Sequence, residues 1–493
     1  MDMLLKQERL DYYERVVDRT VEDSFTVDVV VPDTLEDVGE ALLADGDFCL
    51  WRLDMNTGSA EAEGEWKGIV CFRADGSEKL LHFPVSAGVR LRMLDDHITP
   101  ELRPYAQFRV SDVTVQLMNS RKLRLRLRVS MSVQAYAMSA LEITTGVKKN
   151  PESLFTKTTE TICTMVTDVA EQVFTAGDRS ELRAAPLEGE LLACHSEILA
   201  DVPKRSGARV ILNGKVHTTI LYQAEGQPIP ITEVIETGFA QLLDLENAGD
   251  QDQLYCQTQL TAAEVTVRDS GAIDTEFHIV VQTKCMHEQR ISCISDAYSV
   301  QNPVHLETAA LELTHGKPTD SIRFTAESEA TLDRSQTLIW SASRVRTFKL
   351  TEHQASGSAD IIALFLDTEG HWTSKRFEIR LEQTIPPDTR LLDARVLQIS
   401  ASPDLHLRVS AELEVLTVSN SSVQQIVTMK QTDDATCKNA DRSSLVLLPR
   451  EEDPDLWEIA KTYGSSIDLI RSVNAVPDGE TASAYLLIPR VVC

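Results

Sequence analysis

Cys285, His287 and Cys293 are of residue types that commonly ligate metal ions. Thiolate and imidazole groups are the usual zinc ligands, but a structural zinc site needs four of them at short spacings. No fourth ligand stands at such a spacing here. We therefore interpret the two cysteines as buried thiols and His287 as a surface residue, and we expect no bound metal.

Gly207 and the pair Gly214-Lys215 superficially resemble a phosphate-binding loop, in which backbone N–H groups and a lysine hold nucleotide phosphates. Six residues separate the two glycines instead of four, and no Ser or Thr follows the lysine. The segment is also typical of the start of a strand. Neither a metalloprotease motif nor a nucleophile-elbow motif occurs elsewhere. The sequence therefore predicts a protein that is not an enzyme and carries no cofactor.

A run of cations, Lys122, Arg124, Arg126 and Arg128, alternates with apolar residues. Because successive side chains of a strand point to opposite faces, all four would lie on one face. Such charges can protect an exposed strand from edge-to-edge pairing with another chain. They can also form a docking stripe for an acidic partner or for a neighbouring repeat. Both interpretations stay open at this point.

Charge and composition narrow the classes of partner. The 493 residues include 48 basic and 76 acidic ones, so the net charge is −28. A surface this acidic repels phosphate backbones, and we expect no nucleic-acid partner. The N-terminus lacks an apolar core of signal-peptide length, and no run approaches the ~18 apolar residues of a membrane span. Nine cysteines without a Cys-x-x-Cys pair favour free thiols in a reducing cytosol.

Most of the chain follows a recurring order of signals. Ser24-Phe25-Thr26, Val173-Phe174-Thr175 and Arg323-Phe324-Thr325 are 149 and 150 residues apart, and strand-like runs follow each of them. Residues 123–133 and 405–415 alternate apolar and polar side chains, which is typical of half-buried strands. We predict a mostly β chain of three tandem β-rich repeats, of sandwich or barrel type, followed by a small βααβ domain.

These signals also place the expected boundaries. Leu10, Tyr13, Val17 and Val21 recur at spacings of three and four, which predicts an amphipathic helix over residues 4–22. The expected segments are this helix with a lead-in strand (1–37), three repeats (38–180, 181–325 and 326–430), an acidic linker (431–442) and a C-terminal domain (443–493). We expect the linker to keep the C-terminal domain mobile.

The C-terminal domain carries the most specific pattern. Two short apolar runs, 443–449 and 484–489, enclose two helix patterns with N-terminal capping residues. The helices contain Leu456-Trp457-x-Ile459-Ala460-x-x-Tyr463-Gly464 and Ile467-x-Leu469-Ile470-x-x-x-Asn474. The unit resembles a LysM domain. This resemblance implies a binding module rather than a catalytic domain.

In the LysM family, glycan-binding members usually carry a Gly-Asp-Thr turn before the first helix. Here the turn reads Glu451-Glu-Asp-Pro-Asp455, and these carboxylates favour a protein partner over peptidoglycan. The family's groove lies between this turn and the loop before the last strand. The partner-contacting residues that we expect are Asp455, Trp457, Ile467, Asn474 and Ala475. Trp457 shares an apolar face with Ala460, which favours a place in the core, so Ile467 is the better contact candidate.

The repeats, above all the second, resemble the SPOCS module of endospore coat proteins, on residues 214–222, 231–235 and Asp296-Ala-Tyr-Ser299. SPOCS repeats with a C-terminal LysM domain characterise a family of coat morphogenetic proteins, to which the chain is similar over nearly its whole length. The resemblance implies a scaffold in the mother-cell cytoplasm at the forespore surface. Its LysM end would bind the coat-basement ATPase, and possible further partners are other coat proteins. The alternatives are a peptidoglycan-binding wall or cortex protein and a LysM-bearing hydrolase.

Overall fold

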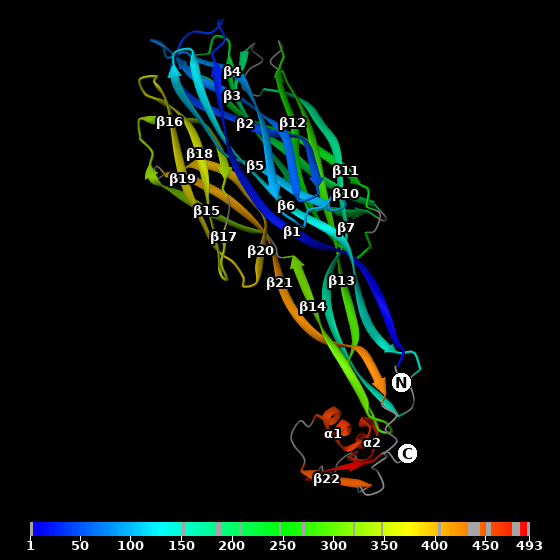
Figure 1. Cartoon of the computed structure of the whole chain (residues 1–493). Helices are drawn as coiled ribbons and strands as arrows, with labels where there is room; N and C mark the ends of the chain where they lie inside the picture. The colour runs from blue at the N-terminus through cyan, green and yellow to red at the C-terminus, as the bar shows by residue number, and fades with distance from the viewer. Residues whose placement is uncertain are drawn as a thin grey trace.

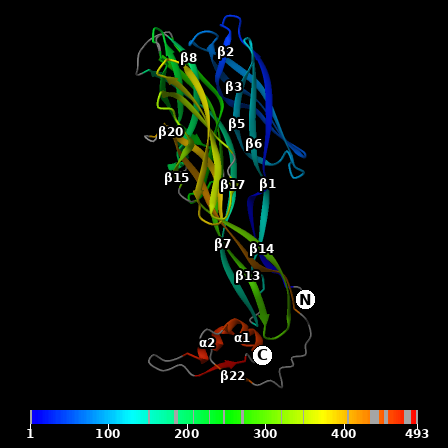
Figure 2. The same ribbon diagram turned by 90° about the vertical axis from the view of Figure 1, so that its left-hand side faces the viewer.

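The computed structural model is an elongated molecule built almost entirely of antiparallel strands, so the predicted mostly β class is confirmed (Figures 1 and 2). A broad upper body narrows into a stalk, and a small helical unit lies at the foot of the stalk. The structure describes residues 3–149, 153–182, 189–206, 209–227, 229–245, 248–268, 272–318, 321–346, 349–402, 406–431, 444–449, 455–475 and 484–490.

The elements fall into four groups along the chain. The first group is β1 (Leu5–Val30), β2 (Val38–Asn56), β3 (Ser59–Ala74), β4 (Leu80–Leu94), β5 (Arg103–Asn119) and β6 (Lys122–Val147). The second is β7 (Leu154–Glu181), β8 (Gly189–Ala200), β9 (Lys204–Ser206), β10 (Arg209–Ala224), β11 (Ile231–Leu243), β12 (Gln253–Val267) and β13 (Ala272–Ser299). The third is β14 (Val304–Pro318), β15 (Ile322–Thr331), β16 (Gln336–Val345), β17 (Lys349–Leu350), β18 (Gln354–Asp367), β19 (Trp372–Thr384), β20 (Thr389–Ala401) and β21 (His406–Gln431). The last is β22 (Leu445–Pro449), α1 (Leu456–Tyr463), α2 (Ile467–Val473) and β23 (Tyr485–Pro489).

One order of pairing occurs in each of the first three groups. In each group a long sheet joins the first strand to the last two. The strand order is β1-β6-β5 in the first group and β7-β13-β12 in the second. In the third group, β14 and β15 lie on one side of β21 and β20 lies on the other. A smaller sheet is formed by the strands between, around β3, β10 or β18. The apolar residues that the alternation in 123–133 predicts to be buried are at most 1% exposed, which confirms that strand.

Strand pairing corrects the N-terminal prediction and the expected boundaries. Residues 5–30 form a strand and not a helix, because they pair with β6 along its whole length and this ladder outweighs the local spacing of apolar residues. β7 pairs with β13, so residues 154–181 belong to the second group and not to the end of the first. The three units therefore run over 5–147, 154–299 and 304–431, instead of 38–180, 181–325 and 326–430.

The three units are joined by shared apolar cores. One core in the upper body combines side chains from all three, namely Leu42, Leu43, Cys71, Leu192, Ala193, Leu221, Trp340, Ala342, Leu364 and Trp372. Another lies along the stalk, where β6, β7, β13 and β14 contribute Ile143, Cys163, Met165, Ile291, Cys293, Leu311 and Leu313. Burial of these faces between units makes one continuous body of the three.

A charged cluster lies beside the upper core and takes one residue from each unit. Asp45, His195 and Arg344 are separated by 150 and 149 residues in the sequence. The Asp45 carboxylate lies 3.0 Å from His195 Nδ1 and also pairs with the Arg344 guanidinium, which donates to the Gly46 carbonyl at 2.7 Å. The carboxylate is 2% exposed, His195 17% and Arg344 12%. Each unit thus supplies one member of a buried ion cluster.

The electrostatics of this cluster predict a pH-dependent stability. Burial lowers the pKa of His195, but the charge of Asp45 and its hydrogen bond outweigh burial and raise that pKa to about 9, with Asp47 adding to this and Arg344 opposing it. The folded protein therefore holds a proton that an unfolded chain releases near pH 6.5. The stabilisation is complete below that pH and is lost as the pH rises through about 9. Thermal midpoints measured from pH 6 to 9.5 should fall, and His195→Gln should flatten the fall.

Removal of the shared carboxylate should be costlier than removal of a surface one. In Asp45→Asn, Arg344 loses its buried counter-ion and His195 loses the charge that keeps it protonated. Loss of one partner of a buried pair costs about 3–5 kcal/mol. The matched control is Asp28→Asn, because Asp28 pairs with Lys122 and Arg124 at the surface, where an ion pair contributes little. Equal denaturation midpoints for the two variants would contradict a structural role for the cluster.

Candidate functional site

The C-terminal unit is a two-stranded sheet packed against two short capped helices. The Asp455 carboxylate accepts hydrogen bonds from the backbone N–H groups of Trp457 and Glu458, and Ser466 caps α2 in the same way. Gly464 ends α1 with a φ of 68°, a left-handed conformation that glycine adopts without strain. The inner faces form a core of Trp457, Ala460, Ile470, Leu486 and Ile488.

This unit is docked on the end of β7 and β13 at the foot of the stalk (Figure 1). Trp457 Nε1 donates to Asp296 Oδ2 at 2.7 Å, and Lys461 Nζ lies 2.6 Å from the same oxygen. The Tyr298 hydroxyl donates to the Ser465 carbonyl at 2.8 Å. We call the end of β13 that carries Asp296 and Tyr298 the strand tip, and these interactions the strand-tip contact. They bring together residues about 160 positions apart in the sequence and link the C-terminal unit to the body.

Aromatic packing gives the strand-tip contact an apolar centre. Tyr298 meets Trp457 edge to face with 5.0 Å between ring centroids, and it stacks on Phe155 of β7 at 5.2 Å. Trp457 is 7% exposed and Tyr298 is 6% exposed. Aromatic pairs of this geometry contribute about 0.5–1.5 kcal/mol beyond the area that they bury. The contact is therefore a packed interface and not a single surface ion pair.

Asp296 is ionised in this interface. Burial raises its pKa, but the hydrogen bonds from Lys461 and Trp457 and from the Ala297 N–H outweigh burial, so the pKa lies below its usual value. The carboxylate is 20% exposed. At neutral pH it accepts from an ammonium and an indole N–H together, which is a charge-assisted arrangement.

The second unit alone carries this acidic and aromatic pair at the end of its long strand. Gly146 and Lys148 precede Asp296 and Tyr298 by 150 residues and occupy the end of the first unit, and Lys430 stands at the end of β21. Gly146 has no side chain, and neither lysine can accept from Lys461 or pack as an aromatic ring. The C-terminal unit follows the third unit in the chain but docks on the second, whose strand end supplies the acceptor and the aromatic ring.

The predicted partner-contacting residues have different places. Trp457 is covered by the strand tip, and Asp455 is the helix cap already described. The Asn474 amide donates to the Ile470 and Leu487 carbonyls at 2.7 and 2.6 Å and accepts from the Leu487 N–H at 2.7 Å, so it joins α2 to β23. Ile467 is half-buried against the core, and Ala475 is exposed. The remainder of the acidic turn (451–454), the loop 476–483 and the linker from 432 to 442 lie outside the described residues.

The outer face of the C-terminal sheet was not among the predicted contact residues. Leu445 is 47% exposed, Leu447 58% and Tyr485 54%, while Val446 and Leu448 face the helices. Leu447 stands opposite Leu487 in the sheet and Pro449 opposite Tyr485, so the exposed side chains form one apolar patch. An alternation of apolar and polar residues along the strand would have revealed this face. All four residues of Leu445-Val446-Leu447-Leu448 are apolar, so the sequence does not show which of them face outward.

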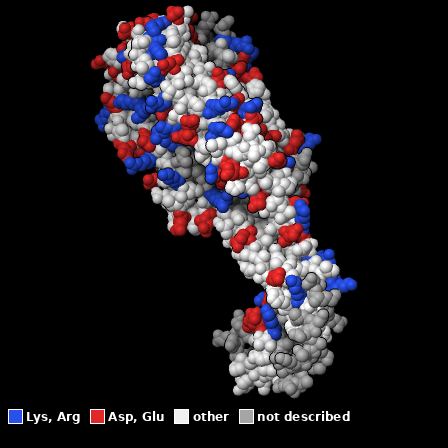
Figure 3. Space-filling view, in the orientation of Figure 1, with Lys and Arg blue, Asp and Glu red and all other residues white. Residues whose placement is uncertain are grey.

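The cationic stripe is largely neutralised within the first unit. Lys122 and Arg124 pair with Asp28 at 2.8 and 2.7 Å, and Arg128 lies 3.5 Å from Glu22, while Arg126 is exposed. The hydrogen bonds from Arg124 and then Lys122 hold the pKa of Asp28 well below its usual range. β6 lies between β1 and β5, so protection of an edge strand is the wrong interpretation. Acidic and basic side chains are interspersed over the face in Figure 3, without a field of one sign.

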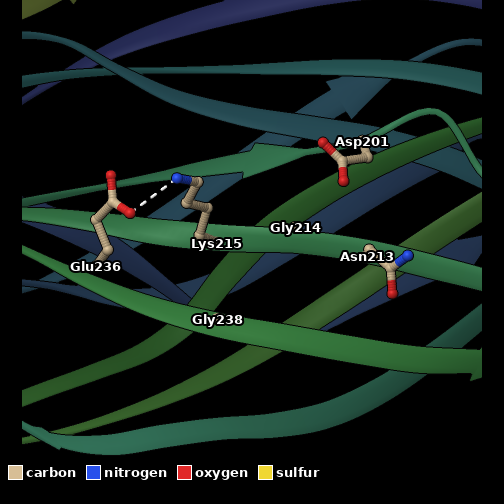
Figure 4. A pocket seen from close by; sticks show the side chains of 6 residues that line it. All are labelled: Asp201, Asn213, Gly214, Lys215, Glu236 and Gly238. Atoms are coloured by element: carbon tan, nitrogen blue, oxygen red, sulfur yellow. Dashed lines mark hydrogen bonds and ion pairs between the residues drawn. The ribbon is translucent and has the colours of Figure 1, made fainter.

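The other candidates for chemistry have structural roles. Gly214 and Lys215 lie within β10, and Lys215 pairs with Glu236 at 2.8 Å beside an open pocket of about 300 Å³ (Figure 4). The pocket is lined by Asp201, Asn213, Gly214, Lys215, Glu236 and Gly238. His287 pairs with Asp252 at 2.7 Å. Among the described residues, no three His, Cys, Asp or Glu side chains are grouped to hold a metal ion, and no described helix is long and apolar enough to span a membrane.

Comparisons with known proteins were made at the level of sequence and of structure. The sequence matches no protein-family model and no curated protein, and the fold matches no solved structure. The exposed sheet face and the strand-tip contact are therefore the observations from which function is inferred.

The amide of Asn474 should be a requirement for a folded C-terminal unit. Asn474→Ala removes three hydrogen bonds and leaves the Leu487 N–H without its acceptor, which should cost the unit about 2–3 kcal/mol. Hydrogen exchange of residues 456–473 in the full chain should accelerate accordingly. Ser472→Ala is the control, because the exposed Ser472 hydroxyl donates only to the nearby Leu469 carbonyl. If hydrogen exchange were unchanged in Asn474→Ala, the amide would not be required to hold α2 to β23.

Proposed function

We propose that the chain is a non-enzymatic scaffold and adaptor in endospore coat assembly. Its C-terminal LysM-like unit would tether the coat-basement ATPase to the forespore surface, in the mother-cell cytoplasm. The observation that carries this proposal is the position of the unit. It lies at the narrow end of the molecule, fixed to the stalk by one side and exposing an apolar sheet face on another.

The resemblance of the units to SPOCS and LysM modules supplies the identity of the partner, and the geometry is compatible with the role. An apolar patch with an aromatic side chain at its rim is the kind of surface that anchors a protein interface. The acidic body should bind basic or cation-rich surfaces in preference to anionic ones. Docking at the strand tip holds the patch in one orientation, which reduces the entropy cost of binding compared with a freely tethered domain.

Leu447 provides the sharpest test of the patch. Leu447→Asp places a charge at its centre, which should weaken binding of the purified coat-basement ATPase by at least tenfold, a loss of ~1.4 kcal/mol. Leu94→Asp is the matched control, because Leu94 is 64% exposed and lies at the end of β4 in the first unit. Biolayer interferometry with the full-length chain measures both variants.

Two results would contradict the adaptor. Equal loss in both variants would show that the patch is not the binding surface. Sedimentation of the wild-type chain with insoluble peptidoglycan, without any affinity for the ATPase, would favour the alternative of a cortex- or wall-binding protein that uses the groove near Asp455 and Ala475.

A further inference from the structure

The side of the C-terminal unit that holds the strand tip has the properties of a peptide-binding site. We propose that α1 and the turn after it bind an extended segment of the form Asp-x-aromatic, and that the chain's own Asp296-Ala297-Tyr298 occupies this site in the structure. A partner with such a segment would then bind in competition with the strand tip. The inference does not depend on the role in the spore coat.

The bound segment is read through alternate side chains of a strand. Asp296 and Tyr298 point to the C-terminal unit, whereas Ala297 between them is buried in the foot of the stalk with Ile426 and Met429. This is the period of two that an extended backbone imposes. A peptide recognised through residues i and i+2 therefore needs only an extended backbone and, between these two, a residue that is small or points away from the site.

Each recognised group has its own partner in the C-terminal unit. The carboxylate accepts from the Trp457 indole N–H and the Lys461 ammonium, 2.7 and 2.6 Å away. The phenol ring packs on the indole, and its hydroxyl donates to the Ser465 carbonyl at 2.8 Å. The C-terminal unit thus distinguishes a segment with an acidic group and a hydroxylated ring from the Gly-x-Lys segment at the end of the first unit. The complementary donors and acceptor are all supplied by residues 457–465.

The site and its occupant belong to separate parts of one chain. The segment lies at the end of β13 in the second unit, whereas α1 follows the third unit, and residues 432–443 connect that unit to Ser444. The strand tip therefore acts as a ligand present at the effective concentration of a tethered group, which is of millimolar order. A free peptide must compete with this tethered segment for the site, so the wild-type chain should bind the peptide weakly.

The experiment removes the internal ligand and supplies it from outside. A fluorescently labelled peptide with the sequence of residues 294–300, Ile-Ser-Asp-Ala-Tyr-Ser-Val, is titrated with the full-length chain. The variant Asp296→Ala/Tyr298→Ala, which we call the opened variant, should bind the peptide at least tenfold more tightly than the wild type by fluorescence anisotropy. A peptide with alanine at both recognised positions should not bind, and neither should the opened variant with Lys461→Glu added.

Hydrogen exchange of residues 456–463 shows whether the site has been vacated, and circular dichroism shows that the body is folded. If the double substitution unfolds the body, Asp296→Asn replaces it, because this change keeps the size of the side chain and removes only its charge. Faster exchange without peptide binding would overturn the proposal. Equal affinity of wild-type and opened chains would overturn it too, because the strand tip would then not occupy the site. Unaltered exchange in a folded opened variant has the same consequence.

Discussion

The long sheets have apolar faces that must be covered, and the rest of the structure depends on this constraint. The six apolar side chains of β6 between Leu123 and Val133 are at most 1% exposed, because an apolar sheet face has to be buried against another element. The smaller sheet of the first unit covers this face, in a core built from residues of that unit, while other apolar cores are shared between the units. The ends of the long strands then converge into one stalk, whose foot is closed by side chains of all three units. This convergence also fixes the position of the end of β7 and β13, on which the C-terminal unit docks.

Polar interactions add specificity to this apolar assembly. The Asp45–His195–Arg344 cluster needs all three units at once, because each supplies one charge. A unit that packed in the wrong order would leave a buried charge without a partner, which costs several kcal/mol. Asp296 has the same function at the foot. The third unit ends in Lys430 and Gln431, neither of which is a carboxylate, whereas the second unit supplies Asp296 to Lys461.

Periodicity in the sequence predicts the parts of the structure in which local pattern and tertiary pairing agree. The strand at 123–133 and the two short helices of the C-terminal unit belong here. The strand at 5–30 could not be predicted, because its helix-like spacing of apolar residues spans a register shift at Arg15 and Val17 within a ladder to a strand over a hundred residues away. Trp457 was expected either in the core or at a partner surface, and it lies in the core of the C-terminal unit, in contact with the second unit of the same chain. Its ring joins the core and its N–H reaches Asp296, a pairing that no spacing in the sequence reveals.

Zero-length cross-linking of the wild-type chain tests the docked C-terminal unit most directly. A carbodiimide joins a carboxylate to an amine only where the two are in contact, and Asp296 and Lys461 lie within 2.6 Å. The exposed pair Lys215 and Glu236, at 2.8 Å within one sheet, is the internal standard. The docked arrangement predicts an amide between Asp296 and Lys461 in the monomeric protein, at a yield comparable to that of the standard. Formation of the Lys215–Glu236 amide without any Asp296–Lys461 product would show that the C-terminal unit is not held by the strand tip.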